Sequence, residues 1–403
     1  MRLLDSPTYR QDVERVAQLP IDWDRLRGTT LALSGASGMI GSFLVDVLMA
    51  RNAEGLDCTI QALVRDRTGF DERFADYANH PNLGLVVGDV GLGPLPDLRA
   101  DYVIHAASNT HPVAYATDPI GTITTNVNGT RNMLDLAVRA GTRRAAFLST
   151  VEIYGECRQP DQWFQETDLG YIDCNTLRAG YPESKRAGEA LCQAFRAQHG
   201  LEVTIPRLPR IYGPTLRSSD TKALSQFLFR AVAGQDIVLK SDGTQFYSYC
   251  QVADAVSAVL VCLLSGEDGA AYNVAHPSGD VRLRDLAELV ARAAGTKVVY
   301  DLPSDLEQRG YSAATRAVMD GTKLARLGWE PMFSVDEGVR RTLAVFKESL
   351  INHVPPSERR IGRSSPPTSC DGRPVHVQDV GDESHPAQRP VDDTASISES
   401  LRK

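Results

Sequence analysis

Tyr181 and Lys185 are the residues of this sequence best suited to removing a proton from an alcohol. They open a helical stretch that reads YPESK, and their i, i+4 spacing places both side chains on one face of the helix. An ammonium beside a phenol favours the phenolate, so the pair predicts a tyrosine whose pKa is lowered toward neutrality and which acts as a general base. A tyrosine–lysine pair on an exposed helix would have the same spacing.

A second group of reactive side chains follows the strand-like stretch in FLSTVEIYG. Parallel strands present the residues at their carboxyl ends to ligands. Thr150 can therefore offer its hydroxyl to a substrate oxygen, and Glu152 points in roughly the same direction, where it can act as a second acid or base. The alternative for Glu152 is a solvated loop carboxylate.

The stretch TTLALSGASGMIGSFLVD, residues 29–46, predicts a site for a dinucleotide. An apolar strand leads into a glycine-rich turn and then into an apolar helix, whose first amides can face a pyrophosphate while glycine lets the backbone come close. The positive charge of an oxidised nicotinamide would also lower the pKa of Tyr181. The residues of this turn that we expect to contact the cofactor are Gly35, Ser37, Gly38, Met39, Ile40 and Gly41.

Charged residues follow the second and third predicted strands. After the second strand, an acid would bond the adenosine ribose and an arginine would pair with a 2′-phosphate. Arg65 and Asp66 stand there side by side, so both interpretations are open. After the third strand, Asp89 is expected to face the adenine, with Val90 beside it, and the alternative for Asp89 is a turn residue.

The fourth predicted strand ends in HAAS. Ala106 and Ala107 are small enough to let a flat ring or a ribose approach the backbone, and Ser108 is assigned to the substrate. Asn126 and Asn128 lie on the following helix, and a buried asparagine needs hydrogen-bond partners. The alternative for each of these residues is a structural polar group.

Apolar strands alternate with helical patterns from residue 29 to about residue 208. This alternation predicts an α/β, Rossmann-type, doubly wound parallel sheet with helices on both faces. The expected strands are 31–34, 59–64, 83–87, 102–105, 145–149 and 202–208, and the expected helices are 39–51, 122–140 and 181–199.

The pattern loosens after residue 208 and predicts a smaller C-terminal α/β substrate lobe, interleaved with the sheet. Its expected helices are 221–233, 252–265, 283–294 and 335–349, and its expected strands are 237–240 and 271–274. The predicted division is a polar N-terminal lead-in (1–28) with one short helix, an NAD(P)-binding domain (29–208), the lobe (209–350) and a disordered tail (351–403).

Composition excludes several classes of function. A net charge of −8 argues against a nucleic-acid or anionic-membrane surface. The seven cysteines include no CxxC pair, so we expect no metal site and reduced thiols in a cytoplasmic protein. The N-terminal stretch lacks a signal-peptide core, and the apolar run 255–264 is too short to span a bilayer.

Taken in order, GASGMIG, HAAS, NVNGT, LSTVEIYG, YPESK, RLPRIYGP and DGTKLARLGWEP resemble the motifs of the extended short-chain dehydrogenase/reductase family, in its nucleotide-sugar epimerase/dehydratase branch. The resemblance covers residues 29–347 and implies a nicotinamide cofactor, a nucleotide-sugar substrate and a homodimer formed through helices 122–140 and 181–199. Carried over by position, it makes Thr150, Tyr181 and Lys185 the catalytic trio, with Lys185 also bonding the nicotinamide ribose.

Two positions depart from the pattern of this branch. This chain has Thr150, Val151 and Glu152 where the comparable stretch of the 4,6-dehydratases resembles Thr-Asp-Glu, so the acid for water elimination is missing. In the UDP-glucuronate decarboxylases the comparable stretch resembles Thr-Ser-Glu. The branch usually has an arginine where Tyr247 stands, to hold the diphosphate of the substrate. Arg210 and Lys240 are candidate substitutes, and both Arg210 and Tyr247 are expected to bind substrate.

The resulting hypothesis is an NAD-dependent epimerase, dehydratase or decarboxylase that acts through a 4-keto sugar. NAD is favoured over NADP, because a cycle that regenerates its cofactor often holds NAD tightly in this branch. The alternatives are an NADPH-dependent carbonyl reductase of the extended family and a non-catalytic, cofactor-sensing module.

Overall fold

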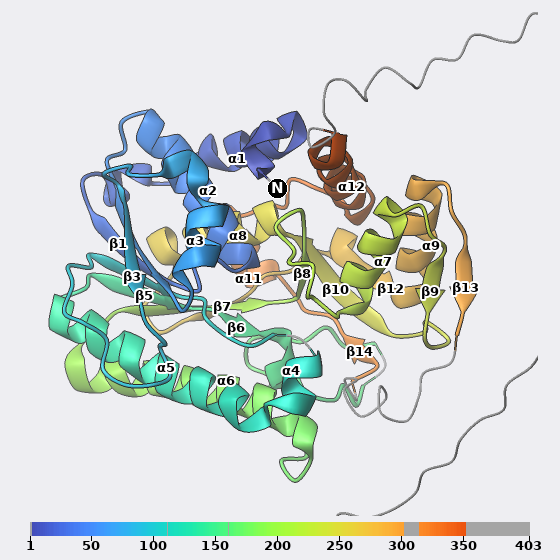
Figure 1. Ribbon diagram of the computed structural model, residues 1–403. Coiled ribbons are helices and arrows are strands. Elements are labelled where there is room, and N and C mark those ends of the chain that lie inside the picture. Colours follow the sequence, from blue (N-terminus) through green and yellow to red (C-terminus); the bar gives the residue numbers. More distant parts are fainter. Residues whose placement is uncertain (1, 111, 160, 302–313, 352–403) are drawn as a thin grey trace, which may run out of the picture. The chain divides into compact units, whose positions relative to one another are not determined.

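The computed structural model describes residues 2–110, 112–159, 161–301 and 314–351. The predicted tail lies outside these ranges except for Ile351, which ends a helix. The main sheet has the strand order β11-β7-β5-β4-β1-β2-β3 with β6 beside β7, and neighbouring strands run parallel (Figure 1). Its strands are β1 Thr30–Ser34, β2 Thr59–Val64, β3 Leu83–Val87, β4 Tyr102–His105, β5 Arg144–Phe147, β6 Ser149–Thr150, β7 Val203–Leu208 and β11 Ala271–Asn273.

The strand order creates a crevice between β1 and β4. The chain passes outward from β1 to β2 and β3 and then returns to β4 on the other side of β1. Ligands of open α/β sheets bind at the carboxyl ends of strands where the order reverses in this way. This arrangement confirms the predicted Rossmann-type sheet. Ser34 and His105, the last residues of β1 and β4, lie at the crevice.

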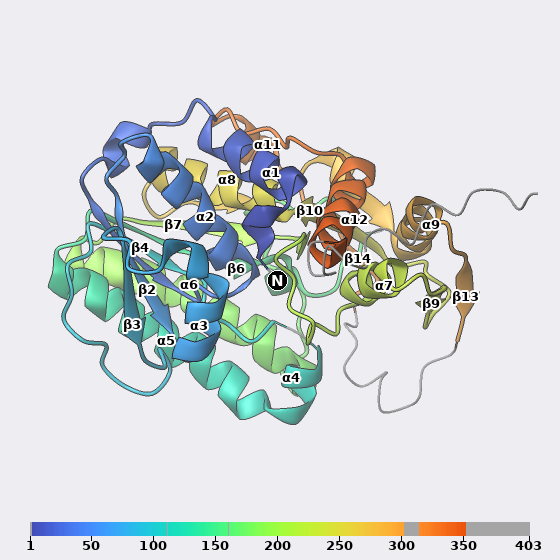
Figure 2. The same cartoon turned by 45° about the horizontal axis from the view of Figure 1, so that its top comes forward.

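Helices cover both faces of the sheet, which is why β1, β4, β5 and β7 are buried at every position and appear as apolar runs in the sequence. One face is covered by α1, α2 and α8, and the other by α5 and α6 (Figures 1 and 2). These helices are α1 Pro7–Ala17, α2 Met39–Ala53, α5 Pro119–Ala140, α6 Gly180–His199 and α8 Val252–Ser265.

The N-terminal lead-in contributes to the core, which its polar composition did not indicate. Helix α1 begins with Pro7 after Ser6, whose hydroxyl accepts a hydrogen bond from the amide of Tyr9. Tyr9, Val13 and Val16 are buried on the side of α1 that packs on α2 and α8. The stretch is polar on average because the other side of the helix faces solvent.

The region after residue 208 forms smaller sheets that lie beside the carboxyl edge of the main sheet (Figure 1). Strand β10 pairs with β8 and β14 in parallel and with β12 antiparallel, and β9 pairs with β13. The elements of this region are β8 Arg210–Tyr212, α7 Ala223–Val232, β9 Ile237–Leu239, β10 Phe246–Gln251, β12 Asp280–Arg282, α9 Leu283–Ala294, β13 Val298–Tyr300, β14 Arg316–Ala317, α11 Thr322–Ala325 and α12 Val335–Ile351.

Two elements after residue 208 belong to the main sheet and not to the lobe. The expected lobe strand 271–274 is β11, which pairs with β7 at the edge of the main sheet, and α8 covers that sheet. The lobe was predicted to be interleaved with the sheet, but the sequence did not indicate which of its elements join the sheet, because a short apolar strand carries no signal of its partner.

The described part of the chain contains neither a membrane-spanning helix nor a cluster of metal-ligating side chains. Among the described residues, no helix combines the length and apolar character that crossing a bilayer requires. The same residues contain no group of three or more His, Cys, Asp or Glu side chains that could hold a metal ion. The cytoplasmic location stays a prediction.

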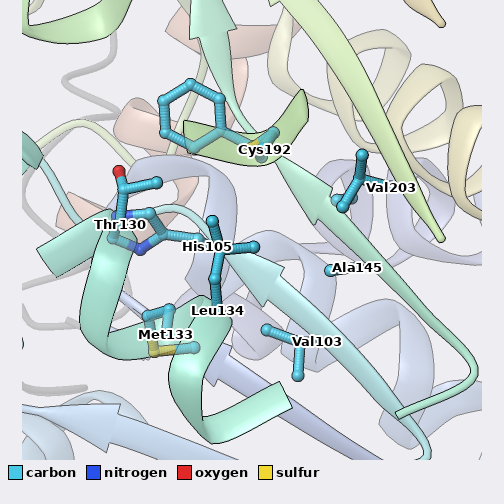
Figure 3. A pocket seen from close by; sticks show the side chains of 10 residues that line it. Val103, His105, Thr130, Met133, Leu134, Ala145, Cys192 and Val203 are labelled. Carbon is cyan, nitrogen blue, oxygen red and sulfur yellow. The ribbon is translucent and has the colours of Figure 1, made fainter. Parts of the chain in front are cut away.

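A small cavity lies between the main sheet and the helices α5 and α6 (Figure 3). His105, Thr130, Met133, Phe147 and Cys192 are among its lining residues. The His105 Nδ1 atom lies 2.7 Å from the Ser34 hydroxyl, while its Nε2 atom is buried without a described partner. Burial, together with the charge of Lys185, lowers the pKa of His105 to about 3, so the ring is neutral in the folded protein at pH 7.

This neutral histidine predicts a pH dependence of stability. In the unfolded chain a histidine titrates at about 6.5. As pH falls below that value, the unfolded state binds a proton that the native state does not bind, so the free energy of unfolding falls by about 1.4 kcal/mol per pH unit. We expect denaturant unfolding between pH 7 and pH 4 to show this fall in wild type but not in His105→Gln. His199→Gln, which changes an exposed ring at the end of α6, serves as the control and should retain the fall. Parallel stability curves for wild type and His105→Gln would contradict the assignment.

Candidate active site

The glycine turn lies against the end of β4. Gly35 has a φ of +71°, a conformation that favours glycine, and a side chain there would come within 2.9 Å of the Ala106 carbonyl and the Ala107 nitrogen. The Ser34 hydroxyl accepts hydrogen bonds from the amides of Ala106 and Ala107, both at 3.2 Å. The glycine turn and the HAAS segment are therefore held together at the crevice.

The N-terminus of α2 fits a diphosphate. Gly38 is its N-cap residue, and no side chain caps the helix there, so the first amides of this 15-residue helix have no side-chain acceptor. The helix begins directly beyond the end of β1, where an anion would meet these amides and the positive end of the helix dipole.

A segment from the lobe reaches this turn, which sequence reasoning missed. Thr215 donates its hydroxyl proton to the Met39 carbonyl at 2.9 Å. Arg217 donates from Nη2 to the Ser37 carbonyl at 2.8 Å and to the Ser37 hydroxyl at 3.1 Å. An exposed guanidinium is thereby held beside the turn where the diphosphate is expected, and no motif in the sequence indicates this contact.

The side chains after β2 and β3 have local roles. Asp66 caps α3 (Arg67–Arg73), its two oxygens accepting from the amides of Thr68 and Gly69 at 3.0 and 2.9 Å. Arg65, by contrast, is exposed just beyond β2. Asp89 accepts from the Gly91 amide at 2.8 Å, as a turn residue does. Contact of Arg65 and Asp89 with the adenosine stays a prediction.

Tyr181 and Thr150 come together at the carboxyl edge of the sheet. Thr150 ends β6, and Tyr181 lies in the first turn of α6. The Tyr181 phenol is hydrogen-bonded to the Thr150 hydroxyl and to the phenol of Tyr115, and the Tyr115 ring stacks on it at 4.8 Å between centroids. Tyr115, on α4 (Pro112–Thr117), was missed because a single tyrosine between two helices carries no signal in one sequence.

Burial opposes the expected acidity of Tyr181. Only 7% of the Tyr181 surface is exposed, and burial, with the nearby Glu152 carboxylate, raises the pKa of its phenol above the usual range. Arg178 and the hydrogen bond from Thr150 act in the opposite direction but do not outweigh burial. Lys185 is not among the main groups that act on this phenol, and spacing along a helix does not report desolvation. The lowering of the pKa by Lys185 together with an oxidised nicotinamide stays a prediction.

Lys185 contacts the segment between β5 and β6, and its bond to the nicotinamide ribose stays a prediction. Its ammonium donates to the Leu148 carbonyl at 2.9 Å and lies 4.9 Å from the centre of the Phe147 ring. Burial lowers the pKa of Lys185 to about 8, so most of its charge is retained at pH 7. The bond ties α6 to the segment between β5 and β6.

Glu152 forms an ion pair with Arg178, a residue that sequence reasoning missed. Arg178 lies three residues before Tyr181, and its guanidinium lies 4.5 Å from the centre of the Tyr115 ring. Its Nε and Nη1 atoms are buried and have no hydrogen-bond partner among the described residues. Its position three residues before Tyr181, one helical turn away, was a signal that could have identified it.

Ser108 and Asn126 link the HAAS segment to α6. The Ser108 hydroxyl donates to Asn126 at 2.7 Å, the Asn126 amide donates to Ser184 at 2.8 Å, and Ser184 donates to the Tyr181 carbonyl at 2.8 Å. Asn126 is fully buried with both ends of its amide paired, as expected for a structural asparagine, whereas Asn128 is exposed. Ser108 therefore lies next to the site, and its contact with substrate stays a prediction.

Arg210 and Tyr247 face each other on β8 and β10. The Arg210 guanidinium lies 3.3 Å from the centre of the Tyr247 ring. The charges of Glu152 and Arg178 also act on the pKa of Tyr247, which places this pair close to the Glu152–Arg178 pair. The two substrate residues predicted after Leu208 thus lie on the lobe side of the same site.

Comparison with known proteins agrees with this geometry. Residues 31–275 match the NAD-dependent epimerase/dehydratase family. UDP-glucuronic acid decarboxylase 5 of Arabidopsis thaliana is 34% identical over 319 residues, which cover 77% of this chain and 86% of the relative. UDP-glucuronic acid decarboxylase 1 of Xenopus tropicalis is 29% identical over 349 residues, covering 86% and 78%.

Two solved structures share the fold. The UDP-glucuronic acid 4-epimerase of Bacillus cereus, in complex with UDP-glucuronic acid and NAD, has a TM-score of 0.68 at 18% identity and covers 80% of this chain and 100% of its own. A dTDP-glucose 4,6-dehydratase of Streptomyces venezuelae with NAD bound has a TM-score of 0.67 at 24% identity and covers 79% and 97%.

The position of Tyr181 predicts its contribution to turnover. Tyr181→Phe removes the proton acceptor and keeps the ring, so we expect kcat to fall about 10²- to 10⁴-fold while the melting temperature and the NAD content stay those of wild type. Tyr171→Phe, which changes an exposed phenol, is the matched control. If Tyr181→Phe turned over at the wild-type rate, the role assigned to the phenol would be wrong.

The contact of Arg217 with the glycine turn predicts an effect on cofactor retention. Arg217→Gln removes the guanidinium beside the expected diphosphate, and we expect the purified protein to retain several-fold less NAD after gel filtration. Arg292→Gln, at an exposed position on α9, should retain as much NAD as wild type. Equal NAD content in all three proteins would show that Arg217 does not hold the cofactor.

Proposed function

The chain belongs to the NAD-dependent epimerase/dehydratase family, and we propose that within it the protein removes the carboxyl group of a UDP-linked hexuronic acid. It is an NAD-dependent enzyme of the epimerase, dehydratase and decarboxylase type that acts on nucleotide sugars. The decarboxylase assignment is supported by its similarity to UDP-glucuronic acid decarboxylases over three quarters of the chain and by the surroundings of Arg178.

The observation that carries this proposal is the pair of unpartnered donors on Arg178. A buried N–H group without an acceptor costs about 1–3 kcal/mol, so a guanidinium in this state favours a ligand that accepts from it. A carboxylate accepts from two guanidinium nitrogens at once. Arg178 acts on Tyr181 electrostatically, so a carboxylate bound to it would lie beside the reacting carbon.

The residues around Thr150 disfavour two other reactions of the family, elimination of water and epimerisation at C5. Val151 is buried and apolar, so elimination of water has no acid at that position. Glu152 is engaged in an ion pair with Arg178, which makes it less available to remove a proton from C5. Loss of CO₂ needs neither group, because a ketone at C4 accepts the electron pair of the bond between C5 and the carboxyl carbon.

Tyr181 and Thr150 then have defined tasks. Tyr181 takes the proton of the C4 hydroxyl, and the Thr150 hydroxyl bonds the same oxygen as it becomes a ketone. When the carboxyl group leaves as CO₂, the same two residues stabilise the enolate oxygen, and a proton is added at C5. Because Tyr181 is buried, neighbouring positive charge must favour its phenolate, and Arg178 supplies part of that charge.

The glycine turn and the open N-terminus of α2 fit the diphosphate of NAD. Gly35, Gly38 and Arg217 would hold it, and Lys185 lies at the sheet edge where the nicotinamide ribose is expected. When bound, NAD supplies an oxidised ring that accepts a hydride from the substrate carbon and can return it. The expected homodimer and the NADP alternative stay predictions.

The proposed reaction is tested by incubating the purified protein with UDP-glucuronic acid and following product by NMR and mass spectrometry. We expect loss of CO₂ and formation of a UDP-pentose, with no conversion of UDP-glucose or dTDP-glucose. Arg178→Gln should lower kcat/KM for UDP-glucuronic acid about tenfold to one hundredfold, because a charged hydrogen bond is lost.

Arg186→Gln provides the control for this substitution, since Arg186 lies on the same helix in a partly exposed pair with Glu183. It should leave kcat/KM unchanged. A UDP-hexuronic acid epimer as the product would replace the decarboxylase proposal with an epimerase. No product from any of these nucleotide sugars would overturn the substrate class.

A further inference from the structure

A second guanidinium, that of Arg210, lies in the lobe-side wall of the active site. Arg210 begins β8 and lies opposite Tyr249 in the parallel pairing of β8 with β10. Its side chain lies over the face of the Tyr247 ring, with 3.3 Å between the guanidinium carbon and the ring centre. Stacking of this kind orients the planar guanidinium and does not use the Nη1 donor.

Arg210 has a free donor. Its Nη1 atom is buried and has no hydrogen-bond partner among the described residues, and no described carboxylate forms a salt bridge with it. The Tyr247 phenol donates to the Ala314 carbonyl at 2.8 Å, so the ring is anchored from its far end. Tyr247 therefore fixes the guanidinium in place and leaves its positive charge uncompensated.

The charges around this wall do not balance. Arg178, Arg210 and Glu152 together carry a net charge of one positive unit, and the charges of all three act on Tyr247. Arg178 acts on Tyr181, whereas Arg210 is not among the main groups that act on it. The Arg178 guanidinium lies 6.0 Å from the centre of the Tyr181 ring, whereas the Arg210 guanidinium stacks on Tyr247 of β10, so the two cations can meet two different anionic groups of one substrate.

We propose that Arg210 binds the diphosphate of the sugar nucleotide, and that Tyr247 is a positioning residue that holds its guanidinium by stacking. This inference rests on the proposed function for the nature of the substrate, because a UDP-hexuronic acid carries two anionic groups separated by the sugar ring. Arg178 takes the carboxylate and Arg210 takes the diphosphate. The guanidinium expected on β10 at position 247 is thereby supplied from the neighbouring strand.

The proposal is tested by calorimetric titration of the NAD-loaded protein with UDP and with uridine. Arg210→Gln should weaken UDP binding about tenfold or more and leave uridine binding unchanged, because only UDP carries the diphosphate. Adding Tyr247→Arg to Arg210→Gln should restore most of the UDP affinity by placing a guanidinium on the facing strand. Arg282→Gln, which changes an exposed guanidinium stacked on Phe246, is the matched control and should bind UDP as wild type does.

Other outcomes overturn the proposal. Equal weakening of UDP and uridine would assign Arg210 to the nucleoside, and no weakening would remove it from the site. If UDP binding were unchanged while UDP-glucuronic acid bound less tightly, Arg210 would hold the carboxylate. These titrations do not depend on turnover, so a failed reaction with UDP-glucuronic acid and a failed role for Arg210 give distinguishable results.

If Arg210→Gln did not fold, as judged by circular dichroism, Arg210→Lys would replace it. An ammonium keeps the charge but cannot stack as a plane or donate in a fork. We then expect UDP affinity to fall several-fold with uridine unchanged, and wild-type UDP affinity in Arg210→Lys would contradict the stacked geometry.

Discussion

The active site depends on the buried hydrogen bond from the Lys185 ammonium to the Leu148 carbonyl. Lys185 lies one turn into α6, and Leu148 lies between β5 and β6, so the bond ties the start of the helix to the carboxyl edge of the sheet. Because Lys185 is only 3% exposed, loss of its acceptor would leave a charge without compensation in the interior. Tyr181 is therefore held beside Thr150, and the segment that ends in Glu152 is placed against Arg178.

This arrangement makes ionisation of the Tyr181 phenol unfavourable without added positive charge. The same packing that positions the Tyr181 phenol also desolvates it and raises its pKa, so the phenol alone is a poor acid in the folded protein. Arg178 offsets part of this effect but is itself shared with Glu152. A positive cofactor ring would favour the Tyr181 phenolate, whereas a substrate carboxylate would pair with Arg178. The binding of both is therefore linked to the ionisation of one tyrosine.

Much of the fold could be predicted because its elements are bounded by local signals. The expected bounds of β2, β3, β4, α8 and α9 coincide with the observed ones, since apolar runs there end at turn residues or at a glycine. The packed face of α1 and the pairing of β11 with β7 depend on distant residues, so composition and periodicity did not reveal them.

Active-site residues that belong to a sequence motif could be predicted, whereas residues that the fold brings to the site from elsewhere in the chain could not. The motifs LSTVEIYG and YPESK identified Thr150 and Tyr181, and the two side chains are in hydrogen-bond contact in the structure. Tyr115, Arg178 and Arg217 reach the site from a short helix, a preceding turn and the lobe, and none of them lies in a motif. Burial, which raises the pKa of the Tyr181 phenol, could not be predicted from spacing for the same reason, because desolvation depends on residues distant in the sequence.

The most direct test is an ultraviolet difference titration of wild type against Tyr181→Phe, with the protein freed of NAD and again with NAD bound. The account predicts that the Tyr181 phenol does not ionise below pH of about 10 in the NAD-free protein and ionises at lower pH once NAD is bound. A Tyr181 phenol that ionised near neutral pH in the NAD-free protein would contradict it, because burial would then not control the acidity of the catalytic group.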